Sequence, residues 1–176
     1  AMDGALGVSH GFSDKLNKRL FYFAAPSFGS DSQVQAALVV AVDIERIEAE
    51  WRGGRPTVFF VDDVNSVFIS NRSELLFWTR PEGDVGLIPS GQDPLPFEYY
   101  DVSGREIWRI NWGAYVPQDA LHLTVALPIL QMTGEALVDA APARRLAWLQ
   151  AAVVAAIFSV LGAIAVFTYE RRRTLA

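Results

Sequence analysis

Four side chains near the first aromatic stretch are of the types that hold a small carboxylate. Lys15, Lys18 and Arg19 precede Tyr22 closely in the sequence. An arginine can bind a carboxylate through two parallel N–H groups, while an ammonium and a phenol hydroxyl supply further donors. Lys15, Lys18, Arg19 and Tyr22 together are therefore a candidate ligand-binding site. The alternative interpretation is a solvated basic loop.

The sequence contains no pattern that predicts a catalytic centre, a metal or a cofactor. It has no cysteine, and its two histidines, His10 and His122, lie far apart. Neither the glycine-rich loops of nucleotide-binding proteins nor the HExxH pattern of zinc enzymes is present. We therefore expect no catalytic residue, no metal site and no cofactor. We expect His10 to be solvated in a loop, and His122 to be an edge or satisfied core residue.

The acidic residues have structural interpretations. Asp62 and Asp63 precede a turn, where such residues are common, and a cation site there is the less favoured reading. Three glutamates at positions 45, 48 and 50 are interpreted as the solvated face of a short helix. The formal net charge of −5 argues against a nucleic-acid partner.

The stretch from residue 146 to residue 169 predicts a transmembrane helix. It contains no charged residue, and about 24 residues at about 1.5 Å each exceed the roughly 30 Å hydrocarbon core of a bilayer. Trp148 and Tyr169 lie at its two ends, where amphipathic rings favour the membrane interface. A buried helix of a soluble core is disfavoured, because such helices usually keep a polar stripe.

The flanks of this stretch favour one orientation. Two arginines precede it at 144–145, and three follow it at 171–173, which favours a cytoplasmic C-terminus. The first twelve residues lack the basic and apolar regions of a signal peptide. We therefore expect either that the chain is part of a longer protein or that its span inserts from the C-terminal end.

Hydrophobic patterns before the span predict mostly strands. They cover residues 19–25, 36–42, 57–62, 67–71, 97–102, 106–111, 122–130 and 136–138. Residues 44–51 form the predicted helix, with Asp43 as its N-cap. A shorter helix is expected at 73–77. Hairpins dominate, so the predicted fold class is α+β, an antiparallel sheet carrying helices.

Several local features complete this prediction. Residues 1–18 and 80–96 are expected to be irregular. The nearly unbroken apolar strand at 36–42 is expected to be central in its sheet. Hairpin turns are expected at 103–104 and 132–134.

The order of five segments resembles a known sensor family. The segments are KRLFYFAAP, LVVAVDIERIEAEW, VFFVDDVNSVFISNRSELLFWT, LHLTVALPILQMTG and DAAPARRLAW. They resemble the extracytoplasmic region of bacterial histidine kinases that sense four-carbon dicarboxylates, a tandem PAS-like (double Cache) module. The resemblance implies a PAS/Cache-like antiparallel sheet with flanking helices, followed by one transmembrane α-helix.

The resemblance also implies a domain organisation. It assigns 1–43 to the C-terminal part of a membrane-distal domain, 44–54 to a linker helix, 55–143 to a membrane-proximal PAS-like domain, 146–169 to the transmembrane helix and 170–176 to a basic cytoplasmic stub. The front of the distal domain is missing, so the ligand pocket is expected to be incomplete.

The resemblance implies the following function. The chain would be the sensor segment of a two-component histidine kinase in the bacterial inner membrane, with its large domain in the periplasm. It would bind a small carboxylate such as succinate through Lys18 or Arg19 and Tyr22. A homodimer is implied, and small residues of the span at 155–163 would let two helices approach closely. The phosphotransferase activity would belong to the parent protein, because no catalytic domain lies in this chain.

A second hypothesis is a membrane-tethered structural or protein-binding module without a small-molecule ligand. The two hypotheses differ in their sensitive residues. A ligand site predicts that changing Lys18 or Arg19 removes ligand binding and leaves folding intact. A protein-binding module predicts no effect from these changes, and sensitivity instead at an exposed strand edge.

Overall fold

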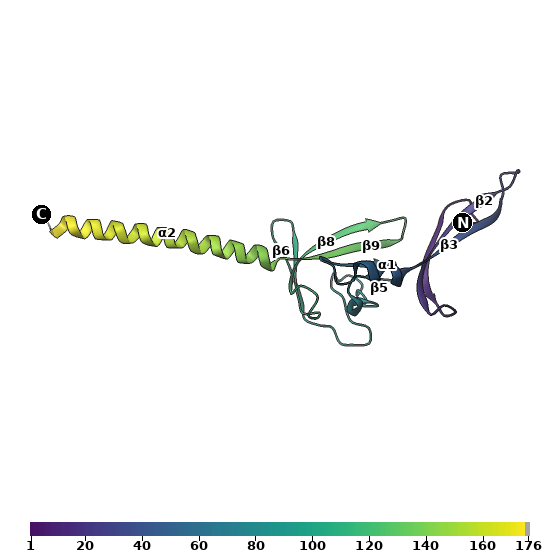
Figure 1. Ribbon diagram of the computed structural model, residues 1–176, viewed down its shortest axis with the longest axis horizontal. Coiled ribbons are helices and arrows are strands. Elements are labelled where there is room, and N and C mark those ends of the chain that lie inside the picture. Colours follow the sequence, from purple (N-terminus) through teal and green to yellow (C-terminus); the bar gives the residue numbers. More distant parts are fainter. Residues whose placement is uncertain (175–176) are drawn as a thin grey trace. The chain divides into compact units, whose positions relative to one another are not determined.

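The computed structural model describes residues 1–174, apart from the side chains of residues 168–170 and 172–174. It divides into one unit of residues 1–139 and a second unit that begins at Ala140. The elements in chain order are β1 (Gly7–Ser13), β2 (Lys18–Phe28), β3 (Val34–Asp43), α1 (Ile44–Trp51), β4 (Thr57–Asp62), β5 (Val67–Ser70), the 3-10 helix η1 (Ser73–Leu75), β6 (Phe97–Asp101), β7 (Glu106–Ile110), β8 (Asp119–Leu127), β9 (Met132–Asp139) and α2 (Ala141–Thr174) (Figure 1). The side chains of Tyr169, Arg172 and Arg173, which the sequence interpretation uses, lie outside the described residues.

A six-stranded sheet forms most of the first unit. Its strand order is β5-β4-β9-β8-β7-β6, and every neighbouring pair is antiparallel. The six strands predicted from residue 57 onward correspond to β4–β9, because their short apolar runs are separated by clear turn residues. The α+β class is confirmed.

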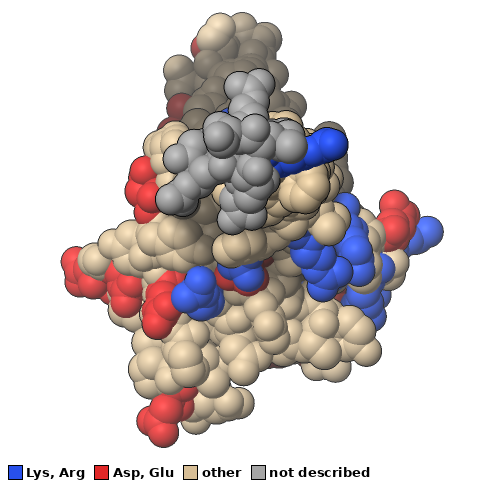
Figure 2. All heavy atoms as spheres, turned by 90° about the vertical axis from the view of Figure 1, so that its left-hand side faces the viewer, with Lys and Arg blue, Asp and Glu red and all other residues tan. Residues whose placement is uncertain are grey.

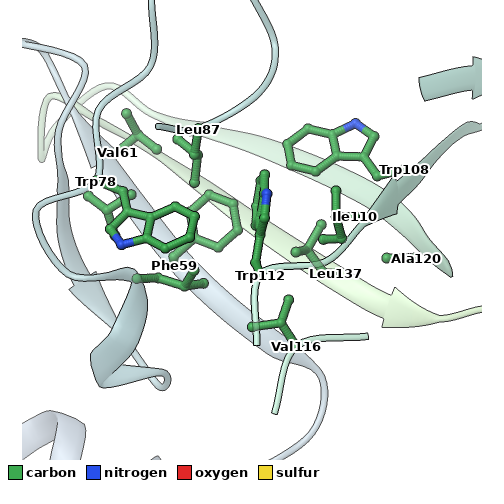
Figure 3. Close-up of a cluster of buried hydrophobic side chains, with 12 residues drawn as sticks. Phe59, Val61, Trp78, Leu87, Trp108, Ile110, Trp112, Val116, Ala120 and Leu137 are labelled. Carbon is green, nitrogen blue, oxygen red and sulfur yellow. The ribbon is translucent and has the colours of Figure 1, made fainter. Parts of the chain in front are cut away.

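The core of this sheet is built from aromatic rings. Phe59 and Trp108 are completely buried, and Trp78 and Trp112 are 8% and 3% exposed. The Trp112 ring meets Trp78 and Trp108 edge to face, with centroids 5.4 Å and 5.6 Å apart (Figure 3). This arrangement suits the quadrupoles of the rings. It ties the irregular segment that carries Trp78 to the strands.

A second, three-stranded sheet has the order β1-β2-β3. The prediction that residues 1–18 are irregular is wrong for residues 7–13, which pair with β2 from Gly7↔Ala24 to Ser13↔Lys18. Glycine and serine have low intrinsic strand preference, but strand formation depends strongly on the neighbouring strand. Pairing with β2 outweighs the local preference here.

The strand β2 continues through Pro26, two residues beyond the last pair with β1. From that point β2 has a neighbour only on the β3 side. A proline is tolerated there, because no strand of the sheet requires its missing N–H.

The prediction that residues 36–42 form a central strand is wrong, because β3 lies at the edge of its sheet. Leu38, Val39 and Val40 are 69%, 56% and 52% exposed. Successive strand residues point to opposite faces of a sheet. Both faces of β3 are therefore uncovered at these positions.

The helix α1 is confirmed with its predicted N-cap. The Asp43 carboxylate accepts a hydrogen bond from the backbone N–H of Arg46 at 3.3 Å. The helix ends just before Gly53, whose φ of +75° is the left-handed conformation that favours glycine.

The two expected hairpin turns have different outcomes. Ser103 and Gly104 have positive φ angles of 56° and 76°, as a tight hairpin turn requires. The turn expected at 132–134 lies instead at 128–131, between β8 and β9. Pro128 cannot donate to a strand ladder, whereas Met132 is buried and begins β9.

The helix α2 is long and apolar enough to cross a membrane. Residues Ala141–Phe167 include a window of mean hydropathy 2.3, none of which is buried. The Ser159 hydroxyl donates to the Ala155 carbonyl at 2.8 Å, which satisfies this polar group within the helix. The helix begins five residues before the predicted span and continues into the basic segment after it.

Candidate functional site

The Lys18 side chain, one of the predicted ligand residues, is about half exposed at the start of β2. Its ammonium forms an ion pair with the Asp43 carboxylate. The hydrogen bond and charge of Asp43 raise the pKa of Lys18. The hydrogen bond from Lys18 in turn lowers the pKa of Asp43. Lys18 is thus accessible, and an anion that bound it would compete with Asp43.

Arg19 is buried, with 4% of its surface exposed. Its Nη1 and Nη2 donate to Oε1 and Oε2 of Glu48 at 3.0 Å and 2.5 Å. Nη1 also donates to the Phe68 carbonyl at 2.6 Å. Oε1 of Glu48 accepts a further hydrogen bond, from the Ser70 backbone N–H at 2.9 Å. This cluster joins β2 of the small sheet to α1 and β5.

The interpretation of Glu48 as a solvated residue is wrong, since it is only 1% exposed. Four residues separate it from Ile44 along α1, so both lie on the buried face of that helix. Burial is possible because the Arg19 guanidinium neutralises the carboxylate.

Tyr22 is partly buried in β2. It shares a strand face with Lys18, whereas Arg19 points to the opposite face because side chains alternate along a strand. Lys18 and Tyr22 therefore lie on one face of β2, whereas Arg19 lies on the other face and pairs with Glu48. Ligand binding by these three residues stays a prediction.

The expectation that His10 is solvated is wrong. It lies in β1, and its Nε2 is 3.2 Å from Oδ2 of Asp62, the last residue of β4. Its ring also lies against the rings of Phe21 and Phe68, at centroid distances of 5.6 Å and 4.5 Å. The Asp62 Oδ1 accepts the backbone N–H groups of Val64 and Ser66, as expected for a turn residue.

The statement that the sequence contains no catalytic pattern is wrong in one respect, because residues 7–11 read Gly-Val-Ser-His-Gly, which matches the GxSxG pattern of hydrolases. That pattern works only on a sharp turn between a strand and a helix. Here all five residues lie within β1. Within residues 1–174, no hydrogen bond joins Ser9 to a histidine, so the geometry of a serine nucleophile is not assembled.

A cavity of about 730 Å³ lies at one end of the six-stranded sheet. Its walls come from four separate segments, at 52–57, 71–74, 114–117 and 137–139. Three of the lining residues are arginines, at positions 52, 55 and 72. This volume lies within the range of small-molecule sites. No sequence pattern indicated it, because the segments are far apart in the chain.

His122 and Arg80 surround the buried carboxylate of Glu135. Arg80 Nη1 and Nη2 donate to it at 2.6 Å and 2.8 Å, and His122 Nε2 lies 2.8 Å from Oε2. The His122 ring stacks on Trp108 at 3.8 Å. The prediction of a satisfied core histidine is confirmed, and the cluster neutralises a buried acid within the sheet.

We expect this cluster to make the stability of the protein fall with pH in the acidic range. Burial alone would raise the pKa of Glu135, but hydrogen bonds from His122 and Arg80 outweigh burial and hold that pKa below its ordinary value of 4.5. An acid whose pKa is lower in the folded than in the unfolded state stabilises the protein at pH values above its unfolded-state pKa. This contribution is lost as the pH falls through the folded-state pKa. The unfolding midpoint, measured between about pH 3 and pH 7, should therefore fall more steeply in acid for the native chain than for Glu135→Gln. If the unfolding midpoint falls equally steeply with pH in both proteins, Glu135 does not cause the pH dependence of stability.

Surface charge is of mixed sign. Figure 2 shows basic and acidic side chains on the same face of the molecule, set among uncharged residues. The binding of polyanionic nucleic acid favours a clustered basic surface instead.

No known protein family matches the sequence, and no curated protein matches it. Among solved structures, the sensor domain of the V. cholerae histidine kinase DctB is similar to this chain, with a TM-score of 0.55 and 19% sequence identity. The similarity covers 78% of this chain and 57% of that structure. This chain therefore spans little more than half of the sensor domain that it resembles. The similarity bears out the predicted PAS/Cache-like α+β fold.

Two chemoreceptor domains have lower similarity. The sensory domain of the Campylobacter jejuni chemoreceptor Tlp3 (CcmL) has a TM-score of 0.47 and 15% identity, over 78% of this chain and 49% of that one. The ligand-binding domain of the Pseudomonas aeruginosa PAO1 amino acid chemoreceptor PctC, in complex with GABA, has a TM-score of 0.46 and 13% identity. This similarity covers 78% of this chain and 57% of that one.

Proposed function

We propose that this chain is a membrane-anchored sensor segment of a two-component histidine kinase. One observation carries the proposal. A unit that resembles the DctB sensor domain leads directly into a helix that is apolar and long enough to cross a membrane. A ligand-dependent change in the sensor unit would then reach the span through the continuous chain from β9 to α2. The kinase reaction belongs to the parent protein.

The chain is proposed to be one part of a double-Cache module. Residues 1–43 are the C-terminal part of a membrane-distal domain, 44–54 are a linker helix and 55–143 are the membrane-proximal domain. The exposed apolar faces of β3 support this division, because a three-stranded sheet needs a covered hydrophobic face to be stable. The rest of a distal domain would supply that cover.

The proposed ligand is a small carboxylate, such as the four-carbon dicarboxylate succinate. Lys18 is accessible and shares a strand face with Tyr22, and these two residues are the proposed ligand contacts. Arg19 would act only if the ligand replaced or joined Glu48 as its partner. The proposed location is the bacterial inner membrane, with the sensor unit in the periplasm, α2 in the bilayer and two chains forming a dimer.

Titration of succinate into the chain, reconstituted in lipid nanodiscs, tests the ligand. We expect saturable binding, with an affinity about tenfold lower for Lys18→Ala, because a charge-assisted hydrogen bond is lost. Arg105→Ala is the matched control, since it removes an exposed positive charge outside the predicted ligand site and should leave the affinity unchanged. The absence of saturable binding would contradict the carboxylate assignment, and an equal loss in both variants would indicate only a general charge effect.

The exposed apolar residues of β3 also favour a second candidate, a membrane-tethered protein-binding module. An uncovered strand edge with apolar side chains is a template for a further strand. In this case Leu38→Lys would abolish partner capture while Lys18→Ala would not. Succinate binding would then be absent from both variants and from the native chain.

A further inference from the structure

Arg72 is a buried cation that has no carboxylate partner among the described residues. It is 6% exposed, and it donates to three backbone carbonyls: Nε to Tyr115 at 2.8 Å, Nη1 to Asn71 at 3.0 Å and Nη2 to Gly54 at 2.8 Å. No ion pair of Arg72 occurs within residues 1–174. Carbonyl groups are uncharged, so they do not neutralise the guanidinium. They accept from three of the five N–H groups of Arg72.

Two other arginines of the described residues are buried or partly buried, and both are paired. The buried Arg19 pairs with Glu48, and the partly buried Arg80 pairs with Glu135. A buried charge is normally paired because its desolvation is costly. Arg72 departs from this pattern, and a bound anion would supply the negative charge that its guanidinium lacks.

The cavity that Arg72 lines also contains Arg52 and Arg55. Both are exposed, and neither forms a hydrogen bond or ion pair through its side chain in the described part of the chain. Two acids, Glu74 and Asp139, line the same cavity. Glu74 is exposed, and within the described residues no ion pair or hydrogen bond joins Arg72 to an acid.

We propose that this cavity binds the phosphate group of a small molecule or lipid. A phosphate presents several acceptor oxygens and up to two negative charges, which matches the unused N–H groups of Arg72 and the two further guanidinium groups. The cavity is larger than a phosphate ion, so it has room for the group to which the phosphate is attached. The site shares no residue with Lys18, Arg19 and Tyr22, and it does not depend on the proposed dicarboxylate ligand.

Two sources of this phosphate chemistry are distinguishable. A soluble phosphomonoester would enter from the aqueous phase. A phospholipid headgroup is the second source, because Asp139 lines the cavity and α2 begins two residues later, at Ala141.

The test measures the thermal unfolding midpoint of the whole chain in dodecyl maltoside micelles, which contain no phosphate. Inorganic phosphate and glycerol 3-phosphate are titrated against sodium chloride at equal ionic strength. In a parallel arm phosphatidylglycerol is added to the micelles and compared with diacylglycerol, a lipid without a phosphate. We expect the midpoint to rise saturably in at least one arm; the arm that responds identifies the source. If neither arm raises the midpoint beyond its salt or lipid control, the proposal is overturned.

Three variants locate the effect. Arg52→Gln with Arg55→Gln should weaken phosphate binding about tenfold or more without loss of folding, because both side chains are exposed. Arg72→Gln should abolish the response, although it also removes hydrogen bonds to three backbone carbonyls. Arg105→Gln, an exposed arginine outside the cavity, is the matched control and should bind like the native chain. A response that survives in the double variant, or falls equally in Arg105→Gln, would overturn the site.

Discussion

Replacing Arg19 with alanine should lower the free energy of unfolding by about 3–5 kcal/mol, because it leaves the buried Glu48 carboxylate without its partner. The same change removes the hydrogen bond to the Phe68 carbonyl. Arg19→Lys should also destabilise, since an ammonium cannot reproduce the two parallel hydrogen bonds. Denaturant unfolding followed by tryptophan fluorescence measures the loss.

A double variant separates a buried ion pair from a general packing effect. Arg19→Met combined with Glu48→Leu removes both charges and should recover most of the stability lost in Arg19→Ala. Lys18→Ala is the control, because its ion pair with Asp43 is at the surface and its loss should have little effect. If Arg19→Ala were as mild as Lys18→Ala, Arg19 would not hold the small sheet to α1 and β5.

Replacing Trp108 with alanine should lower the free energy of unfolding by about 3–5 kcal/mol, because it opens a large cavity in the aromatic core. Trp108 is completely buried and packs against Phe97, Trp112 and His122. The last contact also supports the His122–Glu135 hydrogen bond, so the variant should lose part of its acid sensitivity.

The matched control for Trp108→Ala is Tyr115→Ala. The Tyr115 side chain is 76% exposed, and its carbonyl, which accepts from Arg72, is kept in the variant. Its stability should change by no more than about 0.5 kcal/mol. Similar losses in the two variants would contradict a core organised around Trp108.

Most of the six-stranded sheet could be predicted from the sequence, because its signals are local. β4 and β5 were recognisable from two apolar runs around the turn at 63–66, and the hairpin turn at 103–104 from its Ser-Gly pair. By contrast, β1 exists through its pairing with β2, and its glycines and serines carry no strand signal of their own. The edge position of β3 also depends on which segments lie beside it.

The buried charges were harder to predict, because their partners are distant in sequence. Arg19 and Glu48 are 29 residues apart, and nothing local marks either as paired. One signal did exist: Glu48 falls on the same helical face as Ile44 and Trp51, which predicts burial. The cavity around Arg72 had no such signal, since its walls come from four separate segments.

A sensor that signals through its transmembrane helix requires that ligand binding in the first unit changes α2. The chain has no cysteine, so Gly162→Cys provides a unique attachment point for a spin label, and an added side chain at Gly162 meets no atom within 4 Å. The measurement is the electron paramagnetic resonance spectrum of this label in nanodiscs, with and without saturating succinate. We expect a spectral change, and in Lys18→Ala the succinate concentration that produces half of this change should be about tenfold higher. An identical spectrum with and without succinate, when binding is saturated, would contradict signalling through α2.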